Sequence, residues 1–171
     1  DGANLPFANQ SFDLIVSNLG INNFDFPEDV FNECYRAAKP GAHIALSTNL
    51  HGHMQELYDL YEITLQEIGL EEYIPALQKQ SGERVTIERA SELLAKAGFC
   101  ISQTHQKLFI IRYADAWAFF NSPFIQASFL DGWRSVVPLD LEKEIFSRLV
   151  EKLGRGELRL TVPAGYIEGI K

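Results

Sequence analysis

Apolar residues along the first quarter of the chain fall into two short runs separated by a stretch of helical periodicity. Phe12–Asn18 is an apolar run behind an Asn-Gln turn, which is the composition of a parallel strand buried on both faces. Pro27–Ala38 repeats its apolar residues at helical spacing, and the Lys-Pro-Gly sequence after it ends the helix. Ala42–Thr48 is apolar again. The order strand, helix, strand predicts an α/β crossover unit with Phe12–Asn18 at the centre of its sheet.

The middle of the chain is mainly helical in pattern. His51–Gly69 keeps its apolar residues on one helical face, whereas Leu70–Glu83 is polar and is expected to be irregular or short-helical. Thr86 is a candidate N-cap for a helix that ends at Gly98, and Phe99–Tyr113 follows as a strand.

The last third begins with aromatic residues and ends with alternation. Asp115 is a candidate cap of a short aromatic helix, and Asp140 opens a last helix that Gly154 closes. The large apolar residues from Trp117 to Trp133 have no clean period; they form either a lid over a substrate or, more commonly, core. Leu158–Lys171 alternates apolar and polar residues and predicts a final strand.

Composition restricts the classes of partner. The chain has 15 Lys and Arg against 23 Asp and Glu, a net charge of -8, which argues against nucleic acid. No apolar run approaches the ~18–20 residues of a membrane span, and no signal segment opens the chain. Cys34 and Cys100 form no CxxC pair, so neither a zinc site nor a disulfide framework is indicated, and a cytoplasmic location is expected.

Three pieces of the chain together resemble the class I S-adenosylmethionine-dependent methyltransferases that act on quinones and other small molecules. The first is Asp1–Phe7 leading through Ser-Phe-Asp into Leu-Ile-Val-Ser-Asn-Leu. The second is the helix Pro27–Ala38 with its Lys-Pro-Gly-Ala end. The third is the capped helix Thr86–Phe99 together with the closing strand Leu158–Lys171. Their order and spacing make the resemblance specific.

The resemblance implies an α/β fold, the C-terminal part of a Rossmann-like methyltransferase sheet with an antiparallel final hairpin. The chain is then one domain, 1–171, with helical insertions at 51–82 and 115–155, and it supplies the fourth to seventh strands. The family's glycine-rich loop and ribose-binding acidic residue have no counterpart here, and the chain starts at Asp1 without Met. We therefore expect a fragment that by itself binds the cofactor weakly and is inactive.

The resemblance assigns two segments to S-adenosylmethionine. Asp1, followed by Gly2 and Ala3, would accept the adenine amino group, because a carboxylate beside a backbone N–H complements an aminopurine edge. The competing interpretation is a frayed chain end.

The second segment, Asn18, Leu19 and Gly20, falls at the carboxyl end of a parallel strand, where open α/β sheets bind ligands. The resemblance puts Asn18 and Leu19 against the methionine part of the cofactor. The competing interpretation is a structural turn.

His51 and His53 are weak candidates for a general base, if the acceptor needs one. Methyl transfer is an in-line displacement for which alignment and exclusion of water can supply most of the rate. No third ligand is spaced near the pair, so no metal is expected, and surface histidines opening a helix remain the commoner interpretation.

The leading functional prediction is methyl transfer from S-adenosylmethionine to a small-molecule acceptor. The alternatives are a catalytically silent methyltransferase-like module that binds a partner, and a nicotinamide-dependent dehydrogenase, against which the quoted motifs argue. In the family arrangement Phe12–Asn18 is paired on both sides, but its first-strand neighbour is expected to be missing. Homo-oligomers through this strand edge, or another segment that covers it, are therefore predicted.

Overall fold

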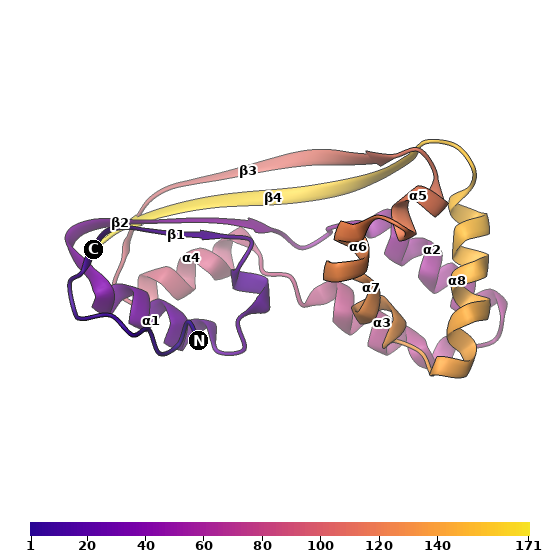
Figure 1. The fold of residues 1–171 in the computed structure, drawn as a ribbon, viewed down its shortest axis with the longest axis horizontal. Helices are drawn as coiled ribbons and strands as arrows, with labels where there is room; N and C mark the ends of the chain where they lie inside the picture. Colours follow the sequence, from indigo (N-terminus) through magenta and orange to yellow (C-terminus); the bar gives the residue numbers. More distant parts are fainter. The chain divides into compact units, whose positions relative to one another are not determined.

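The computed structural model describes residues 1–171 and contains one four-stranded sheet, in the order β1-β2-β4-β3 (Figure 1). The strands are β1 (Phe12–Asn18), β2 (Ala38–Asn49), β3 (Cys100–Tyr113) and β4 (Leu158–Ile170). β1 and β2 are parallel and are joined by helix α1 (Pro27–Ala37), whereas β4 runs antiparallel to β2 and is hydrogen-bonded to β3. The predicted α/β fold with a crossover unit and an antiparallel final strand is confirmed.

The chain divides into two compact units, and β3 and β4 contribute residues to both. The first unit contains Asp1–His51, Arg84–Leu108 and Pro163–Lys171; the second contains Gly52–Glu83 and Phe109–Val162. The ranges predicted as insertions, 51–82 and 115–155, fall almost wholly in the second unit. Their interpretation as insertions into one domain stays a prediction.

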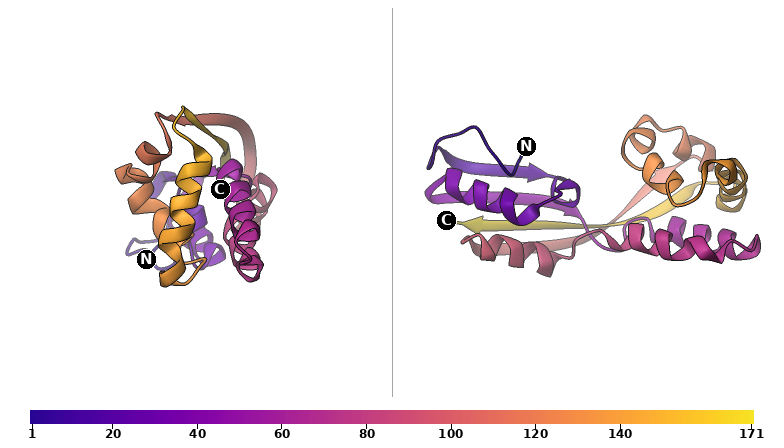
Figure 2. Two further views of the ribbon diagram at one scale, coloured as in Figure 1. Left: turned by 90° about the vertical axis from the view of Figure 1, so that its right-hand side faces the viewer. Right: turned by 90° about the horizontal axis from the view of Figure 1, so that it is seen from below.

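In the first unit, α1 and α4 (Ile87–Lys96) pack side by side against one face of the strands (Figure 2, right). Their apolar sides meet the inward residues of the sheet in a buried cluster that includes Phe31, Ile44 and Leu94. Lys171, the last residue, donates from Nζ to the carbonyl oxygens of Tyr35 (2.6 Å) and Ala38 (2.9 Å), which satisfies backbone groups at the end of α1.

The apolar composition of β1 predicts a central strand buried on both faces. In the structure β1 is instead the edge strand of the sheet. It pairs only with β2, and its side chains Leu14 and Val16 are 57% and 65% exposed. Burial on both faces requires a packing partner on each face, and in residues 1–171 the helices cover only the face that carries Ile15. The edge of β1 on the side away from β2 is unpaired, as the resemblance to the family predicts.

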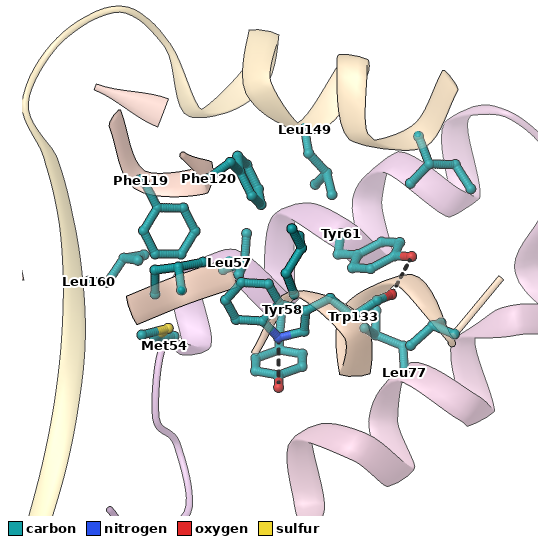
Figure 3. Close-up of a cluster of buried hydrophobic side chains, with 14 of the residues drawn as sticks. Met54, Leu57, Tyr58, Tyr61, Leu77, Phe119, Phe120, Trp133, Leu149 and Leu160 are labelled. Carbon is teal, nitrogen blue, oxygen red and sulfur yellow. Dashed lines mark hydrogen bonds between the residues drawn. The ribbon is translucent and has the colours of Figure 1, made fainter. Parts of the chain in front are cut away.

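The second unit is helical and has its own core, part of which Figure 3 shows. Trp133, Phe119 and Tyr61 are among its largest fully buried side chains. Of the aromatic residues from Trp117 to Trp133, most pack as core, whereas Trp117 and Phe124 are exposed. The helical elements of the unit are α2 (Gln55–Glu67), η2 (Glu71–Tyr73), α3 (Ile74–Gly82), α5 (Ala116–Phe120), α6 (Pro123–Ser128), α7 (Leu130–Arg134) and α8 (Leu139–Leu153). None of the helices is long and apolar enough to cross a membrane.

Local capping predictions are confirmed. Thr86 Oγ1 accepts the backbone N–H of Arg89 at 3.2 Å, and Asp115 Oδ1 accepts that of Ala118 at 2.7 Å. Two predicted boundaries shift. β2 begins at Ala38, because the Lys-Pro-Gly sequence continues as extended chain and Gly41 donates its N–H to Lys171 O at 2.8 Å. α2 begins at Gln55, four residues after the predicted start.

We expect Gly98→Ala to lower the free energy of unfolding by about 2–3 kcal/mol. Gly98 has φ +110°, and a Cβ there would lie 2.8 Å from two ring atoms of Tyr35, which packs edge-on against Phe99. The substitution thus combines backbone strain with displacement of a packed ring. Urea denaturation measures the effect. Gly82→Ala is the control, since nothing lies within 4 Å of that Cβ position, and equal losses in both variants would contradict the prediction.

Candidate functional site

The turn after β1 holds a leucine in the left-handed backbone conformation. Leu19 has φ +58°, which costs a non-glycine residue about 1–2 kcal/mol. Two hydrogen bonds hold it there: its N–H donates to Ser47 O at 2.8 Å, and its C=O accepts Asn23 Nδ2 at 3.2 Å. Residues held in sparsely populated conformations cluster at functional sites. The turn at Leu19 is therefore a candidate ligand site at the carboxyl end of a parallel strand.

Gly20 follows Leu19 and is required for the packing of the turn. A Cβ at this position would lie 2.6 Å from Ser17 Oγ and 3.0 Å from the ring of Phe24. The space beside Gly20 is thus filled by this chain itself. A larger side chain would displace the turn that carries Leu19.

Asn18 presents hydrogen-bonding groups at the open edge of β1. Its side-chain Oδ1 accepts the hydroxyl of Ser47, and its NH2 group makes no hydrogen bond within the chain. In the parallel ladder, Leu19 N–H points to β2, so the backbone groups of the preceding residue point away from β2. The Asn18 C=O is therefore directed outward, where it can accept a hydrogen bond from an ammonium group.

Asn22 links three parts of this end of the first unit and had no recognisable signal in the sequence. Its Nδ2 donates to Thr48 Oγ1 (3.0 Å) and Asn49 O (2.7 Å), and its Oδ1 accepts Val85 N–H (3.0 Å). The turn after β1, the end of β2 and the approach to α4 are thereby joined. These partners lie 26 to 63 residues away, so no local pattern could predict the role.

Asp1, Gly2 and Ala3 form a tight local turn. Asp1 Oδ1 accepts the N–H of Ala3 at 2.9 Å. Gly2 lies against Val30, and a Cβ added to Gly2 would lie 3.3 Å from the two methyl groups of Val30. The second carboxylate oxygen of Asp1 and the N–H of Gly2 make no hydrogen bond within the chain. An acceptor beside a donor therefore remains for an aminopurine edge, so these residues fit the adenine group.

A hollow of about 310 Å³ runs along β1. Gly2 and Ser17, the residue before Asn18, are among the residues that line it. The volume is within the range of small-molecule pockets. The remaining lining residues are apolar: Leu5, Phe7, Phe12, Leu14, Ile15, Val16, Phe24, Val30 and Cys34. Of the six sequence-predicted cofactor residues, Gly2 lines this apolar hollow, and the second segment begins directly after the lining residue Ser17.

Cys34 is the one thiol in this hollow, and it is not suited to act as a nucleophile. Burial, with a smaller effect of the neighbouring Glu33 carboxylate, raises the pKa of Cys34 to about 11. The thiol stays protonated at neutral pH, and the thiolate is the reactive form. Cys34 thus contributes to the apolar wall.

The two histidines predicted as weak base candidates have different surroundings. His51 has an exposed side chain, and its backbone N–H donates to Val85 O at 3.3 Å. His53 belongs to the second unit, is 5% exposed, and stacks on Phe129 with ring centroids 5.5 Å apart. No group of three His, Cys, Asp or Glu side chains in residues 1–171 could hold a metal. A catalytic role for either histidine stays a prediction.

Comparison with protein families matches residues 1–46 to the methyltransferase domain family. A ubiquinone/menaquinone biosynthesis C-methyltransferase of Ruegeria sp. (strain TM1040) is 35% identical over 68 residues, 38% of this chain and 27% of the relative. A malonyl-(acyl-carrier protein) O-methyltransferase of Marinomonas sp. (strain MWYL1) is 40% identical over 57 residues, 33% of this chain and 21% of the relative. The chain thus spans about a quarter of the length of these curated relatives.

Solved structures share the fold at low sequence identity. A presumed methyltransferase from Bacillus halodurans has a TM-score of 0.56 and 16% identity over 100% of this chain and 69% of its own. The cyclase SpnF has a TM-score of 0.52 and 14% identity over 100% of this chain and 53% of its own. The predicted resemblance to the class I methyltransferases is confirmed, and the cyclase illustrates that the fold alone does not define the reaction.

Proposed function

Since the chain resembles the class I S-adenosylmethionine-dependent methyltransferases in its first 46 residues and in its fold, we propose that the protein transfers a methyl group from S-adenosylmethionine to a small-molecule acceptor. One observation carries this proposal. The segment that matches the methyltransferase family is the same segment that contains all six predicted cofactor residues and lines the hollow along β1.

The proposed cofactor site consists of this hollow and the two predicted segments, one on each side of the ligand. At one end, the Asp1 carboxylate accepts the adenine amino group and the Gly2 N–H donates to a ring nitrogen, with Ala3 holding the turn. At the other end, the outward C=O of Asn18 accepts a hydrogen bond from the methionine ammonium. Leu19 and Gly20 hold the turn in the conformation that exposes this group. The apolar wall between them would exclude water from the ligand.

The bound cofactor supplies an activated methyl group, and this chain's residues act by binding and alignment. Alignment of two reactants converts a bimolecular step into an effectively unimolecular one, which accounts for much of the rate in such displacements. If the acceptor must lose a proton, His51 is the better candidate for the base, because its side chain is exposed whereas His53 is buried.

The class of acceptor is proposed only as a small molecule. One relative is named as a C-methyltransferase of quinone biosynthesis and another as an O-methyltransferase, so relatives of similar identity differ in the atom that they methylate. The proposal therefore names no acceptor atom.

Binding of S-adenosylhomocysteine to the full-length protein tests the proposal. We expect Asn18→Ala to weaken binding by roughly 1–2 kcal/mol through loss of the hydrogen bonds of its amide at the cofactor, without a comparable loss of stability, because its bond to the Ser47 hydroxyl is exposed. Titration calorimetry gives the affinity, and Asn32→Ala, on the exposed side of α1, is the control.

Two results would contradict this assignment. A fall in thermal stability of Asn18→Ala with unchanged affinity would make Asn18 structural. No binding of S-adenosylhomocysteine by the wild-type protein would favour the second candidate function, a silent methyltransferase-like module that binds a partner.

We also propose that two copies of the protein associate through the open edge of β1. The N–H and C=O groups of Leu14, Val16 and Asn18 all point away from β2, and no other segment of residues 1–171 pairs with them. Asp13, the one charged residue of the strand, is paired with Lys39 at 2.7 Å. An unpaired edge with no unpaired charge is a template for another strand, and a second copy offers an identical one.

A further inference from the structure

Arg36, on α1, is bonded to the loop that leads into β1. Its Nη1 donates to the C=O of Phe7 (2.9 Å) and to Asn9 Oδ1 (2.7 Å), and its Nη2 donates to the C=O of Leu5 (3.2 Å). The same guanidinium forms a bidentate pair with Glu33, one helical turn earlier, at 2.8 Å for both bonds. One side chain thus holds three points of the loop and one of the helix.

Glu33 completes the attachment. Its Oε2 accepts the backbone N–H of Leu5 at 3.0 Å, so Leu5 is bound at its N–H by Glu33 and at its C=O by Arg36. For residues 1–7, every hydrogen bond to the rest of the chain is made with one of these two side chains. We call Glu33 and Arg36 with these bonds the loop clasp.

Leu5, which the loop clasp holds, lies two residues after the turn of Asp1, Gly2 and Ala3. That turn is closed by bonds between its own residues and Asn4, and Gly2 lies against Val30 of α1. The direction in which the Asp1 carboxylate and the Gly2 N–H point therefore depends on how Leu5 is held. A residue bound at both its N–H and its C=O cannot rotate without breaking one of the bonds.

We propose that Glu33 and Arg36 are positioning residues that set the selectivity of the site for a 6-aminopurine. This inference rests on the proposed function. A carboxylate that is fixed in place discriminates an amino group from an oxo group, because the oxo group presents an acceptor where a donor is needed. A carboxylate on a loose loop can move away, so that selectivity falls before general affinity does.

The charge state of the clasp suits this role at physiological pH. The hydrogen bonds from Arg36 and then from Leu5 N–H lower the pKa of Glu33 to about 2. A lowered carboxyl pKa stabilises the folded state fully above the ordinary pKa, and that contribution is lost as the pH falls from about 4.5 towards 2. The clasp therefore stays closed over the pH range in which the protein would act.

The test compares S-adenosylhomocysteine with S-inosylhomocysteine, which carries an oxo group in place of the 6-amino group. Titration calorimetry on the full-length wild-type protein is expected to give about 10- to 100-fold tighter binding of the amino ligand, the effect of one charge-assisted hydrogen bond. Arg36→Gln should reduce this ratio to about threefold or less, and Arg36→Lys should restore part of it, because a lysine can replace only some of the guanidinium bonds.

Two further variants make the test specific. Glu33→Gln keeps the side-chain shape and an acceptor for Leu5 N–H, so it should fold and show an intermediate ratio of the two ligand affinities. This variant replaces Arg36→Gln in the test if Arg36→Gln does not fold. Arg89→Gln removes an ion pair to Glu28 (3.4 Å) in the same unit, and its ratio should equal that of the wild type.

The outcomes separate the inference from the function beneath it. Wild-type protein that binds neither ligand overturns the proposed function and the inference with it. In a second outcome the wild-type protein prefers the amino ligand, but the variants keep the full preference or lose affinity for both ligands equally. That outcome leaves the proposed function standing and overturns the positioning role.

Discussion

Trp133→Ala is expected to lower the free energy of unfolding of the second unit by about 3–5 kcal/mol, the usual loss on truncating a buried tryptophan. Trp133 is 2% exposed, and its ring lies 5.7 Å from those of both Phe119 and Phe129 (Figure 3 shows Phe119). Its indole N–H donates to Tyr58 OH at 3.1 Å, and its C=O accepts Tyr61 OH at 3.1 Å. The variant would leave a cavity and remove a buried hydrogen bond.

Urea unfolding followed by circular dichroism measures this loss, and Trp117→Ala is the matched control. Trp117 is 68% exposed, so its removal should change the free energy of unfolding by less than about 0.5 kcal/mol. The chain has two tryptophans, so the fluorescence of Trp133→Ala should also be that of a solvated indole. Similar destabilisation by both substitutions would show that the core is not organised around Trp133.

Val16→Lys should abolish the self-association proposed for the β1 edge or weaken it by at least about tenfold. A tenfold loss corresponds to about 1.4 kcal/mol of association free energy. Val16 is 65% exposed at the centre of an unpaired edge, and lysine on an edge strand opposes pairing with a second strand because its charge would have to be desolvated. Light scattering at several concentrations gives the mass of each variant. The wild-type mass should rise with concentration, whereas that of Val16→Lys should stay that of one chain.

Leu139→Lys controls for a general effect of added charge. Leu139 is 85% exposed on α8, far from β1 in the sequence, and its replacement should leave association unchanged. Equal loss in both variants would point to non-specific association. A wild-type protein that stays monomeric at all concentrations and is thermally stable would show that a second copy does not cover the edge.

Elements with local chemical signals could be predicted from the sequence. Pro27 at the start of α1, the side-chain caps Thr86 and Asp115, and Gly98 with its positive φ all mark their boundaries through bonds within a few residues. The range Leu70–Glu83 was less clear, and it forms η2 and α3, because polar residues on exposed helix faces resemble those of a loop.

The candidate site was predictable only in part. The motif around Asn18 and the position of a turn after an apolar strand indicated a ligand site from sequence alone. Glu33 and Arg36 had a visible i, i+3 spacing on a helix, which is a signal for an ion pair. Their bonds to Leu5 and Phe7, 28 to 31 residues away, had no counterpart in any local pattern.

The sequence by itself therefore determined the order of strands and helices and their main caps, because these depend on periodicity and on chemistry between near neighbours, and its motifs carried the resemblance to methyltransferases. Only the tertiary structure decided that one face of β1 is exposed, that Asn22 joins three segments, and that the loop clasp holds residues 5–9. An apolar strand has the same composition whether its second side is covered or open. Burial and long-range hydrogen bonds depend on which distant segments meet, and that is a property of the folded chain.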